Sequence, residues 1–254
     1  MVREPEEPLS DSVPCTACPL RALALFKGAE PKELALIESL RGAQLRRKAG
    51  QVLIAEGQAN VPLYTLFAGW AFRFKTLSDG RRQILNFLLP GDFIGLQQKV
   101  SEQAAHGVEA LTDVWLCPFQ RDALWILHRE APALGYDVTW LAAHEESVVD
   151  DHLLSVGRRS AEERVAMLLV LLYKRAAALL SAVPAEGLAF PLTQQHIADA
   201  LGLSLVHTHR TLRALERRGL HAIADGRLRL LNPKALLKMA DLWGDGRPAE
   251  RPLI

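Results

Sequence analysis

Between residues 191 and 219, apolar positions recur at helical spacing in two short segments that a glycine separates. The first segment, 194–200, carries its apolar residues on one face, and Gly202 follows where the chain has to turn sharply. The second segment, Leu205 to Arg218, has the same one-sided pattern and stops before Gly219. The spacing predicts two helices joined by a tight turn, which together form a helix-turn-helix.

Hydroxyl side chains precede both expected helices. Thr193 and Ser204 are placed to accept hydrogen bonds from the first free backbone amides of the helix that follows each of them. On the second helix Thr208, Leu212 and Leu215 share the inward face. The outward face carries a β-branched group, an imidazole and two guanidiniums: Val206, His209, Arg210 and Arg213. A helix start of this chemistry suits the base edges of a DNA major groove.

The segment after the second helix alternates apolar and polar residues. It runs from His221 to Leu230 and centres on Asp225-Gly226, a strong two-residue signal for a β-hairpin. A hairpin in this place is a wing, so we predict a winged helix-turn-helix. The competing interpretation is an ordinary pair of helices with a solvated basic face.

From Ala43 to about Leu124 the pattern changes to short runs of β character separated by turns. Their regular spacing predicts a barrel or sandwich of about eight strands. A short amphipathic helix, Pro31 to Leu40, precedes them. A helix rich in Leu and Ala, from Ala161 to Leu180, leads to the helix-turn-helix, and the capping box Ser160-Ala-Glu-Glu163 opens it.

A long helix is expected between the strands and this region, from about Ala131 to Ser155, and Gly157 is placed to end it. One of its faces repeats with spacings of four and three residues: Leu134, Val138, Leu141, Glu145, Val148, His152 and Ser155. We interpret this heptad seam as a parallel coiled-coil dimer interface, in which Glu145 and His152 set the register rather than bind a metal. The alternative is a helix packed on its own barrel.

Charge is distributed unevenly along the chain. From Arg158 onward there are 15 Lys and Arg and 9 Asp and Glu, a net +6, whereas the preceding residues have 15 and 20, a net −5. This contrast fits a DNA-binding module joined to a part that does not bind DNA. No apolar run reaches the about 18 residues of a membrane span, and no signal-peptide core is present near the start. We therefore expect a cytoplasmic protein without membrane contacts.

Three cysteines are too few to predict a disulfide framework. Cys15 and Cys18 form a lone C-x2-C pair, and Cys117 lies far along the chain. A tetrahedral metal site or an iron–sulfur cluster takes four ligands, so this spacing favours packing roles for the thiols over metal ligation.

The order of strands, long helix and winged helix-turn-helix resembles the Crp/Fnr family of bacterial transcription regulators over about residues 28 to 240. Four motifs carry the resemblance: Pro90-Gly-Asp-Phe-Ile-Gly95, Leu77-Ser-Asp-Gly-Arg-Arg-Gln83, Gly157-Arg-Arg-Ser-Ala-Glu-Glu-Arg164 and Thr193-Gln-Gln-His-Ile-Ala-Asp-Ala-Leu-Gly-Leu-Ser204. The second motif is similar to the nitrogen-fixation regulators of the family. The resemblance implies an α+β fold.

The resemblance divides the chain into five parts. They are a flexible N-terminal segment with the C-x2-C pair (1–27), a β-roll sensor domain of the jelly-roll, cyclic-nucleotide-binding-like kind (28–130), a dimerisation helix (131–157), a winged helix-turn-helix DNA-binding domain (158–241) and a flexible tail (242–254).

The chain departs from the family's cyclic-nucleotide binders. These carry a Glu after the turn glycine for the ribose, and an Arg-Ser pair further on for the cyclic phosphate. Here Gly95 is followed by Leu96-Gln97-Gln98, and Ala104-Ala105 stands at the second place. A buried phosphate without a guanidinium is poorly compensated, so we do not expect cyclic AMP to bind.

The resemblance implies a homodimeric transcription regulator, not an enzyme, that binds double-stranded DNA at a palindrome, with RNA polymerase as a further candidate partner. The DNA-binding positions that it implies are Thr193, Gln195, Ser204, Leu205, Val206, His207, His209, Arg210 and Arg213. Arg210 is expected to read a guanine, and Val206 to contact a thymine methyl group. Thr193, Gln195 and His207 are expected to contact phosphates.

Two alternatives stay open. The family's oxygen sensors hold a [4Fe–4S] cluster with four cysteines, of which Cys15, Cys18 and Cys117 are an incomplete set, so an iron–sulfur or haem redox sensor is the first. The second is a ligand-binding or interaction module that does not bind DNA.

Overall fold

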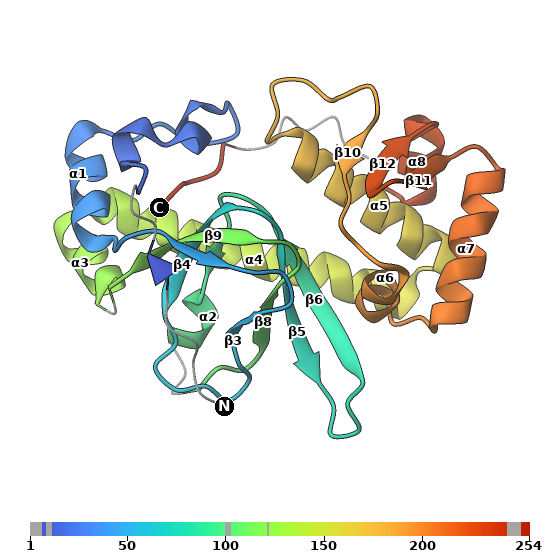
Figure 1. The fold of residues 1–254 in the computed structure, drawn as a ribbon, viewed down its shortest axis with the longest axis horizontal. Coiled ribbons are helices and arrows are strands. Elements are labelled where there is room, and N and C mark those ends of the chain that lie inside the picture. Colours follow the sequence, from blue (N-terminus) through green and yellow to red (C-terminus); the bar gives the residue numbers. More distant parts are fainter. Residues whose placement is uncertain (1–6, 9–11, 100–102, 121, 243–249) are drawn as a thin grey trace. The chain divides into compact units, whose positions relative to one another are not determined.

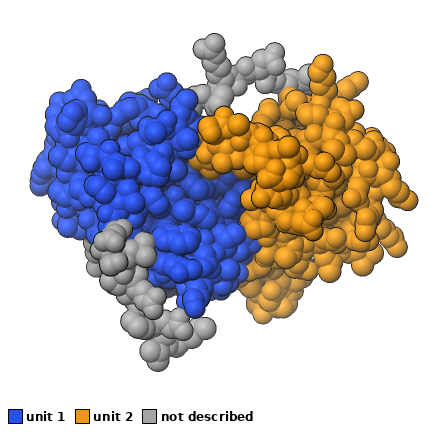
Figure 2. All heavy atoms as spheres, turned by 45° about the horizontal axis from the view of Figure 1, so that its top comes forward, with its two compact units in different colours: residues 1–75, 87–146, 250–254 blue, residues 76–86, 147–249 orange. Residues whose placement is uncertain are grey.

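The computed structural model describes residues 7–8, 12–99, 103–120, 122–242 and 250–254 (Figure 1). The chain forms two compact units, which are coloured separately in Figure 2. Unit 1 comprises residues 1–75, 87–146 and 250–254, and unit 2 comprises residues 76–86 and 147–249. Each unit is described by itself below.

Unit 1 is built on two antiparallel sheets, with the strand orders β1-β2-β9-β4-β7 and β3-β8-β5-β6, although residues 82–86 of β6 belong to unit 2 (Figure 1). The strands are β1 (Glu7–Pro8), β2 (Leu45–Arg47), β3 (Val52–Ile54), β4 (Leu63–Ala68), β5 (Ala71–Thr76), β6 (Arg82–Leu88), β7 (Phe93–Ile94), β8 (Gly107–Ala110) and β9 (Val114–Phe119). The predicted sandwich between residues 43 and 124 is confirmed. A short helix, α2 (Leu96–Lys99), follows β7.

The alternation of side chains along β4 separates the two faces of the first sheet. Tyr64 and Leu66 point into the core between the sheets, where Val108 and Leu116 from β8 and β9 meet them. Leu63 lies on the other face of the sheet. There it packs against three helices, α1 (Pro31–Leu40), α3 (Ala123–Glu130) and the first half of α4 (Pro132–Arg158).

Helix α4 corrects the predicted dimer seam. Leu134, Val138 and Leu141 are buried in the core of unit 1, and buried Glu145 forms an ion pair with Arg73 of β5. For Leu134 to Glu145 the heptad pattern therefore records how α4 covers its own sheet, which was the alternative interpretation. The remaining predicted seam residues, Val148 and His152, are half-buried, and Ser155 is buried. The helix continues through Gly157 and ends at Arg158.

Both ends of the chain also differ from the prediction that they are flexible. In the N-terminal segment, Cys15, Leu20 and Phe26 are buried, and two 3-10 turns, η1 (Cys15–Ala17) and η2 (Pro19–Ala22), organise it. In the tail, Leu253 and Ile254 are buried in unit 1. Apolar side chains at both ends cover the outer face of the sheet. Residues 1–6, 9–11 and 243–249 lie outside the described residues.

Unit 2 is organised around α5 (Ala161–Ala177), whose buried Val165, Leu168, Leu169 and Leu172 contact the elements around it. These are α6 (Gln194–Leu201), α7 (Leu205–Arg217), α8 (Pro233–Met239) and a small antiparallel sheet of β10 (Leu188–Ala189), β12 (Arg227–Leu230) and β11 (His221–Ala224). The predicted capping box at Ser160 is present, although α5 ends three residues early. In the described part of the chain, none of the helices combines the length and apolar character that crossing a bilayer takes.

Candidate functional site

The helix-turn-helix forms as the sequence predicts, because every local signal is satisfied. The hydroxyl of Thr193 accepts a hydrogen bond from the amide of His196, and that of Ser204 accepts one from the amide of His207, both at 3.2 Å. Gly202 ends α6 with a φ of +63°, a left-handed conformation that glycine adopts without steric cost. Gly219 ends α7 in the same way, with a φ of +68°.

Two side chains from other elements hold the carbonyl end of α6. Arg164 of α5 donates to the carbonyl of Leu201 at 3.0 Å, and Gln83 of β6 donates to the carbonyl of Ala200 at 2.9 Å. The last carbonyls of a helix have no partner within it, so these bonds satisfy two of them. Arg82 adds an ion pair with Asp199 of α6 at 3.4 Å. These contacts hold the end of α6, from which the turn to α7 begins.

The exposed face of α7 brings most of the predicted DNA-binding residues together. Thr208, Leu212 and Leu215 are buried beneath it, as expected. The residues that the face presents to solvent are Leu205, Val206, His207, His209, Arg210 and Arg213. Val206 is 62% exposed, so its methyl groups are accessible to a ligand.

Some of these side chains are hydrogen-bonded or ion-paired within the protein, whereas others are not. Gln195 donates to Asp199 at 2.6 Å, and Arg213 pairs with Glu216 at 2.9 Å. Arg210 has neither a hydrogen bond nor an ion pair with any described residue, and its side chain is open to solvent. A guanidinium without an internal partner keeps all its donors for a ligand.

One residue of this surface was missed by the sequence analysis. Gln194, the first residue of α6, lies 3.1 Å from a ring nitrogen of His209 through its side-chain oxygen, and so joins the starts of α6 and α7. Gln194 directly follows the N-cap Thr193. This position could have identified it, because a side chain at the start of a helix lies close to a ligand bound at that end.

The wing is a tight hairpin beside this surface. Strands β11 and β12 pair in register from His221 with Leu230 to Ala224 with Arg227. Asp225 and Gly226 both have positive φ, 50° and 67°, which is the type I′ geometry that the Asp-Gly pair predicted.

Both halves of the chain match known domain families. Residues 163–239 match the Crp-like helix-turn-helix domain, and residues 44–130 match the cyclic nucleotide-binding domain. The nitrogen fixation regulation protein FixK of Bradyrhizobium diazoefficiens is 34% identical over 226 residues, which cover 89% of this chain and 93% of that protein. The chain belongs to the Crp/Fnr family.

Two further Crp/Fnr proteins agree with this assignment. The transcriptional activator protein FnrL of Cereibacter sphaeroides is 32% identical over 211 residues, covering 82% of this chain and 84% of FnrL. The structure of FixK2 from Bradyrhizobium japonicum superposes with a TM-score of 0.71 at 27% identity, covering 79% of this chain and 97% of that one. The chain is a FixK/FnrL-like transcription regulator with a helix-turn-helix DNA-binding domain, which supports the main interpretation over both alternatives.

The β-roll of this Crp/Fnr protein contains a buried charged cluster. The guanidinium of Arg73 on β5 donates to the carboxylate of Glu145 on α4 and, at 3.2 Å, to the ring of His106. All three residues are buried. Arg73, which lies between Phe72 and Phe74 in the sequence, was not identified by the sequence analysis. Ala104, at the place where the resemblance puts the phosphate-binding arginine of the nucleotide binders, is also buried. With the buried guanidinium already paired, these residues do not fit a cyclic phosphate.

The ring of His106 is expected to make unfolding pH-dependent. Burial, together with the charges of Arg73 and Lys75, lowers the pKa of His106 from 6.5 to about 4. Between pH 6.5 and pH 4 the ring of His106 binds a proton in the unfolded chain but not in the folded chain. The free energy of unfolding therefore falls by about 3 kcal/mol as the pH drops from above 6.5 toward 4. Urea unfolding at pH 7 and pH 5 measures this loss. A His106→Gln variant keeps an acceptor for Arg73 and should show a smaller loss; equal losses in both proteins would contradict the assignment.

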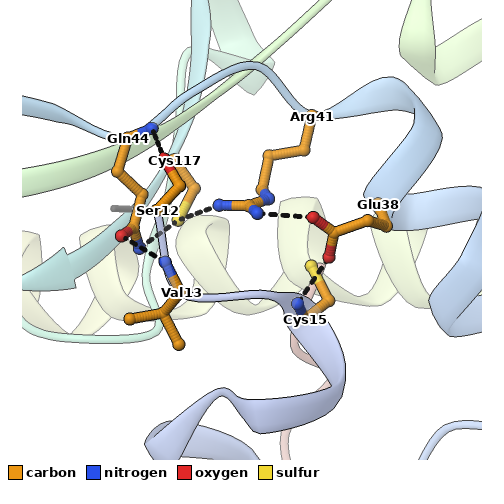
Figure 3. A network of polar contacts seen from close by, with 7 residues as sticks. All are labelled: Ser12, Val13, Cys15, Glu38, Arg41, Gln44 and Cys117. Atoms are coloured by element: carbon orange, nitrogen blue, oxygen red, sulfur yellow. Dashed lines mark hydrogen bonds and ion pairs between the residues drawn. The ribbon is translucent and has the colours of Figure 1, made fainter. Parts of the chain in front are cut away.

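The three cysteines lie in unit 1, and two of them share a polar network (Figure 3). Arg41 lies between Glu38, at 2.6 Å, and the sulfur of Cys117, at 4.0 Å, and Gln44 donates to the same sulfur at 3.4 Å. The backbone amide of Cys15 donates to the other oxygen of Glu38. The network ties the N-terminal segment to α1 and β9.

The environments of Cys15 and Cys117 do not suit ligands of an iron–sulfur cluster. Burial, and a hydrogen bond with Glu38, raise the pKa of Cys15 to about 12, and burial also raises the pKa of Cys117. Metals and clusters bind thiolates, whereas these environments favour the protonated thiol. Among the described residues no three His, Cys, Asp or Glu side chains are grouped so that they could hold a metal ion.

Proposed function

We propose that this regulator acts in the bacterial cytoplasm as a homodimer on a palindromic operator, with α7 of each protomer in the major groove of one half-site. The exposed start of α7, capped by Ser204 and carrying the unpaired guanidinium of Arg210, is the observation that supports this proposal. A capped helix start with free donors is suited to base edges and phosphates.

The proposal divides residues of this surface into those that contact bases and those that contact phosphates. Arg210 reads a guanine through its two acceptor atoms, and Val206 contacts a thymine methyl group. Thr193, Gln195 and His207 contact phosphates and fix the register of the helix in the groove. Gln194 orients His209 through their hydrogen bond.

The proposed dimer interface is the face of α4 that its own sheet leaves exposed, in place of the seam predicted from the heptads. Tyr136, Leu153 and Leu154 are 70%, 66% and 51% exposed, and Ala142 and Ala143 leave room for close approach. Exposed apolar side chains on one helix favour pairing with a second copy.

The test is selection of DNA by the purified full chain from a pool of random duplexes. We expect an inverted repeat with half-site centres about 10 base pairs apart. Affinity for the selected duplex should fall linearly on logarithmic axes as salt rises, with a slope of about −0.9 per phosphate contact. Added cyclic AMP should leave the affinity unchanged. Selection of no repeated sequence, or affinity independent of salt, would overturn the proposal.

A further inference from the structure

The segment 250–254 returns to unit 1 after the winged helix has ended, and its backbone joins that of the N-terminal segment. The amide of Arg251 donates to the carbonyl of Leu25 at 2.8 Å, and the amide of Lys27 donates to the carbonyl of Arg251 at 2.8 Å. Phe26 and Arg251 thereby form a parallel bridge. This is the way an added strand binds a sheet edge, through its main chain.

The side chain of Arg251 meets a buried carboxylate. Its guanidinium lies 2.6 Å from Asp92, and the two side chains are only 12% and 1% exposed. Asp92 also accepts a hydrogen bond from the amide of Leu89, which fixes it in the turn at Pro90-Gly91. A buried carboxylate requires a cation nearby, so this site selects a basic residue at position 251.

The residues after Arg251 fill an apolar surface. Pro252, Leu253 and Ile254 are all buried, and Ile254 joins the core that Leu63 and Phe93 line. Arg21 donates to the carbonyl of Leu253 at 3.0 Å, and the hydroxyl of Thr65 donates to that of Ile254. The surface therefore recognises a short peptide of the order basic, proline, apolar, apolar.

We propose that this groove is a peptide-binding site of unit 1 and that residues 250–254 are its intramolecular ligand, which tethers the end of the DNA-binding unit to the β-roll. The groove is formed by residues 21–27, the turn at Asp92 and the outer face of β4. The eight Cα–Cα steps from Leu242 to Glu250 can span at most about 28 Å, so docking sets an upper limit on how far Leu242 can lie from the groove.

The first experiment adds the peptide in trans. A chain that ends at residue 249 is expected to bind an acetylated and amidated peptide of residues 250–254, whereas the full chain, whose groove is filled, is not. The same peptide with Arg251→Met should bind at least about tenfold more weakly, because the buried carboxylate then lacks its cation. Isothermal titration calorimetry measures both affinities, and absence of binding, or equal binding of the two peptides, would overturn the proposal.

The second experiment uses the full chain and does not depend on the shortened chain folding. In an Arg251→Met variant, hydrogen exchange at the amides of Lys27 and position 251 should accelerate at least about tenfold. The matched control is Lys238→Met, which removes one exposed positive charge from α8 and should leave both amides protected. If exchange is unchanged in the Arg251 variant, the proposed role of Arg251 is wrong. If protection in the original chain disappears on dilution, the peptide comes from a second copy and is not an intramolecular ligand. Neither experiment contains DNA, so its outcome is separate from that of the operator selection.

Discussion

Replacing Glu145 with alanine is expected to lower the free energy of unfolding by about 3–5 kcal/mol, which is the cost of leaving one member of a buried ion pair without its partner. Both side chains of the Arg73–Glu145 pair are about nine-tenths buried. The remaining neighbour of the guanidinium, His106, is an uncharged ring at neutral pH and cannot balance the charge. Urea unfolding at pH 7, followed by circular dichroism, measures the loss.

Two further variants separate the pair's charge from its packing. Glu145→Gln keeps a carbonyl oxygen for the hydrogen bond and should lose less than the alanine variant. The double variant Arg73→Met, Glu145→Leu removes both charges and keeps the volume, so it should recover most of the stability. If the double variant is less stable than Glu145→Ala, the ion pair is not the reason for the loss.

The second large effect is expected on DNA. Arg210→Ala should weaken binding to the selected operator by about 1–3 kcal/mol and relax the base preference at one position of each half-site. The reason is that a guanidinium paired with both acceptors of a guanine discriminates against every other base at that position. Fluorescence anisotropy on the operator and on single-base variants of it measures both changes.

Arg217→Ala is the charge-matched control for this experiment. Arg217 is also exposed on α7, but it lies at the far end of the helix, about two turns beyond Arg210. Its loss should weaken binding to all sequences by a similar small factor, since it can contribute only to phosphate attraction. Equal weakening by Arg210→Ala on the operator and on random DNA would contradict direct readout by Arg210.

The DNA-binding half of the protein was predictable because its determinants are local. Thr193 and Ser204 cap the helices that follow them, Gly202 and Gly219 supply left-handed turns, and Asp225-Gly226 closes the wing. Each of these signals acts within a few residues of chain. The sequence therefore specified α6, α7 and the hairpin almost to the residue.

The parts that the sequence did not predict depend on contacts between distant residues. A heptad repeat shows that α4 buries one face, but not whether a second helix or its own sheet covers that face. Arg73 and Glu145 are separated by 72 residues, and Arg251 and Asp92 by 159. No short-range pattern indicates such pairs. The same reason explains why the tail, whose four last residues look unremarkable, was expected to be flexible.

Because α4 uses Leu134, Val138 and Leu141 for its own sheet, the face left for a second copy holds Leu153 and Leu154 beside the carboxylates of Glu146 and Asp150. In the proposed pair these carboxylates repel those of the second copy, so we expect the pair to dissociate on dilution. Below its dissociation constant, the concentration of pairs rises with the square of the total chain concentration, so that doubling the protein gives about four times as many pairs. Occupancy of a palindrome then follows the rates of synthesis and degradation more steeply than it would for a permanent dimer.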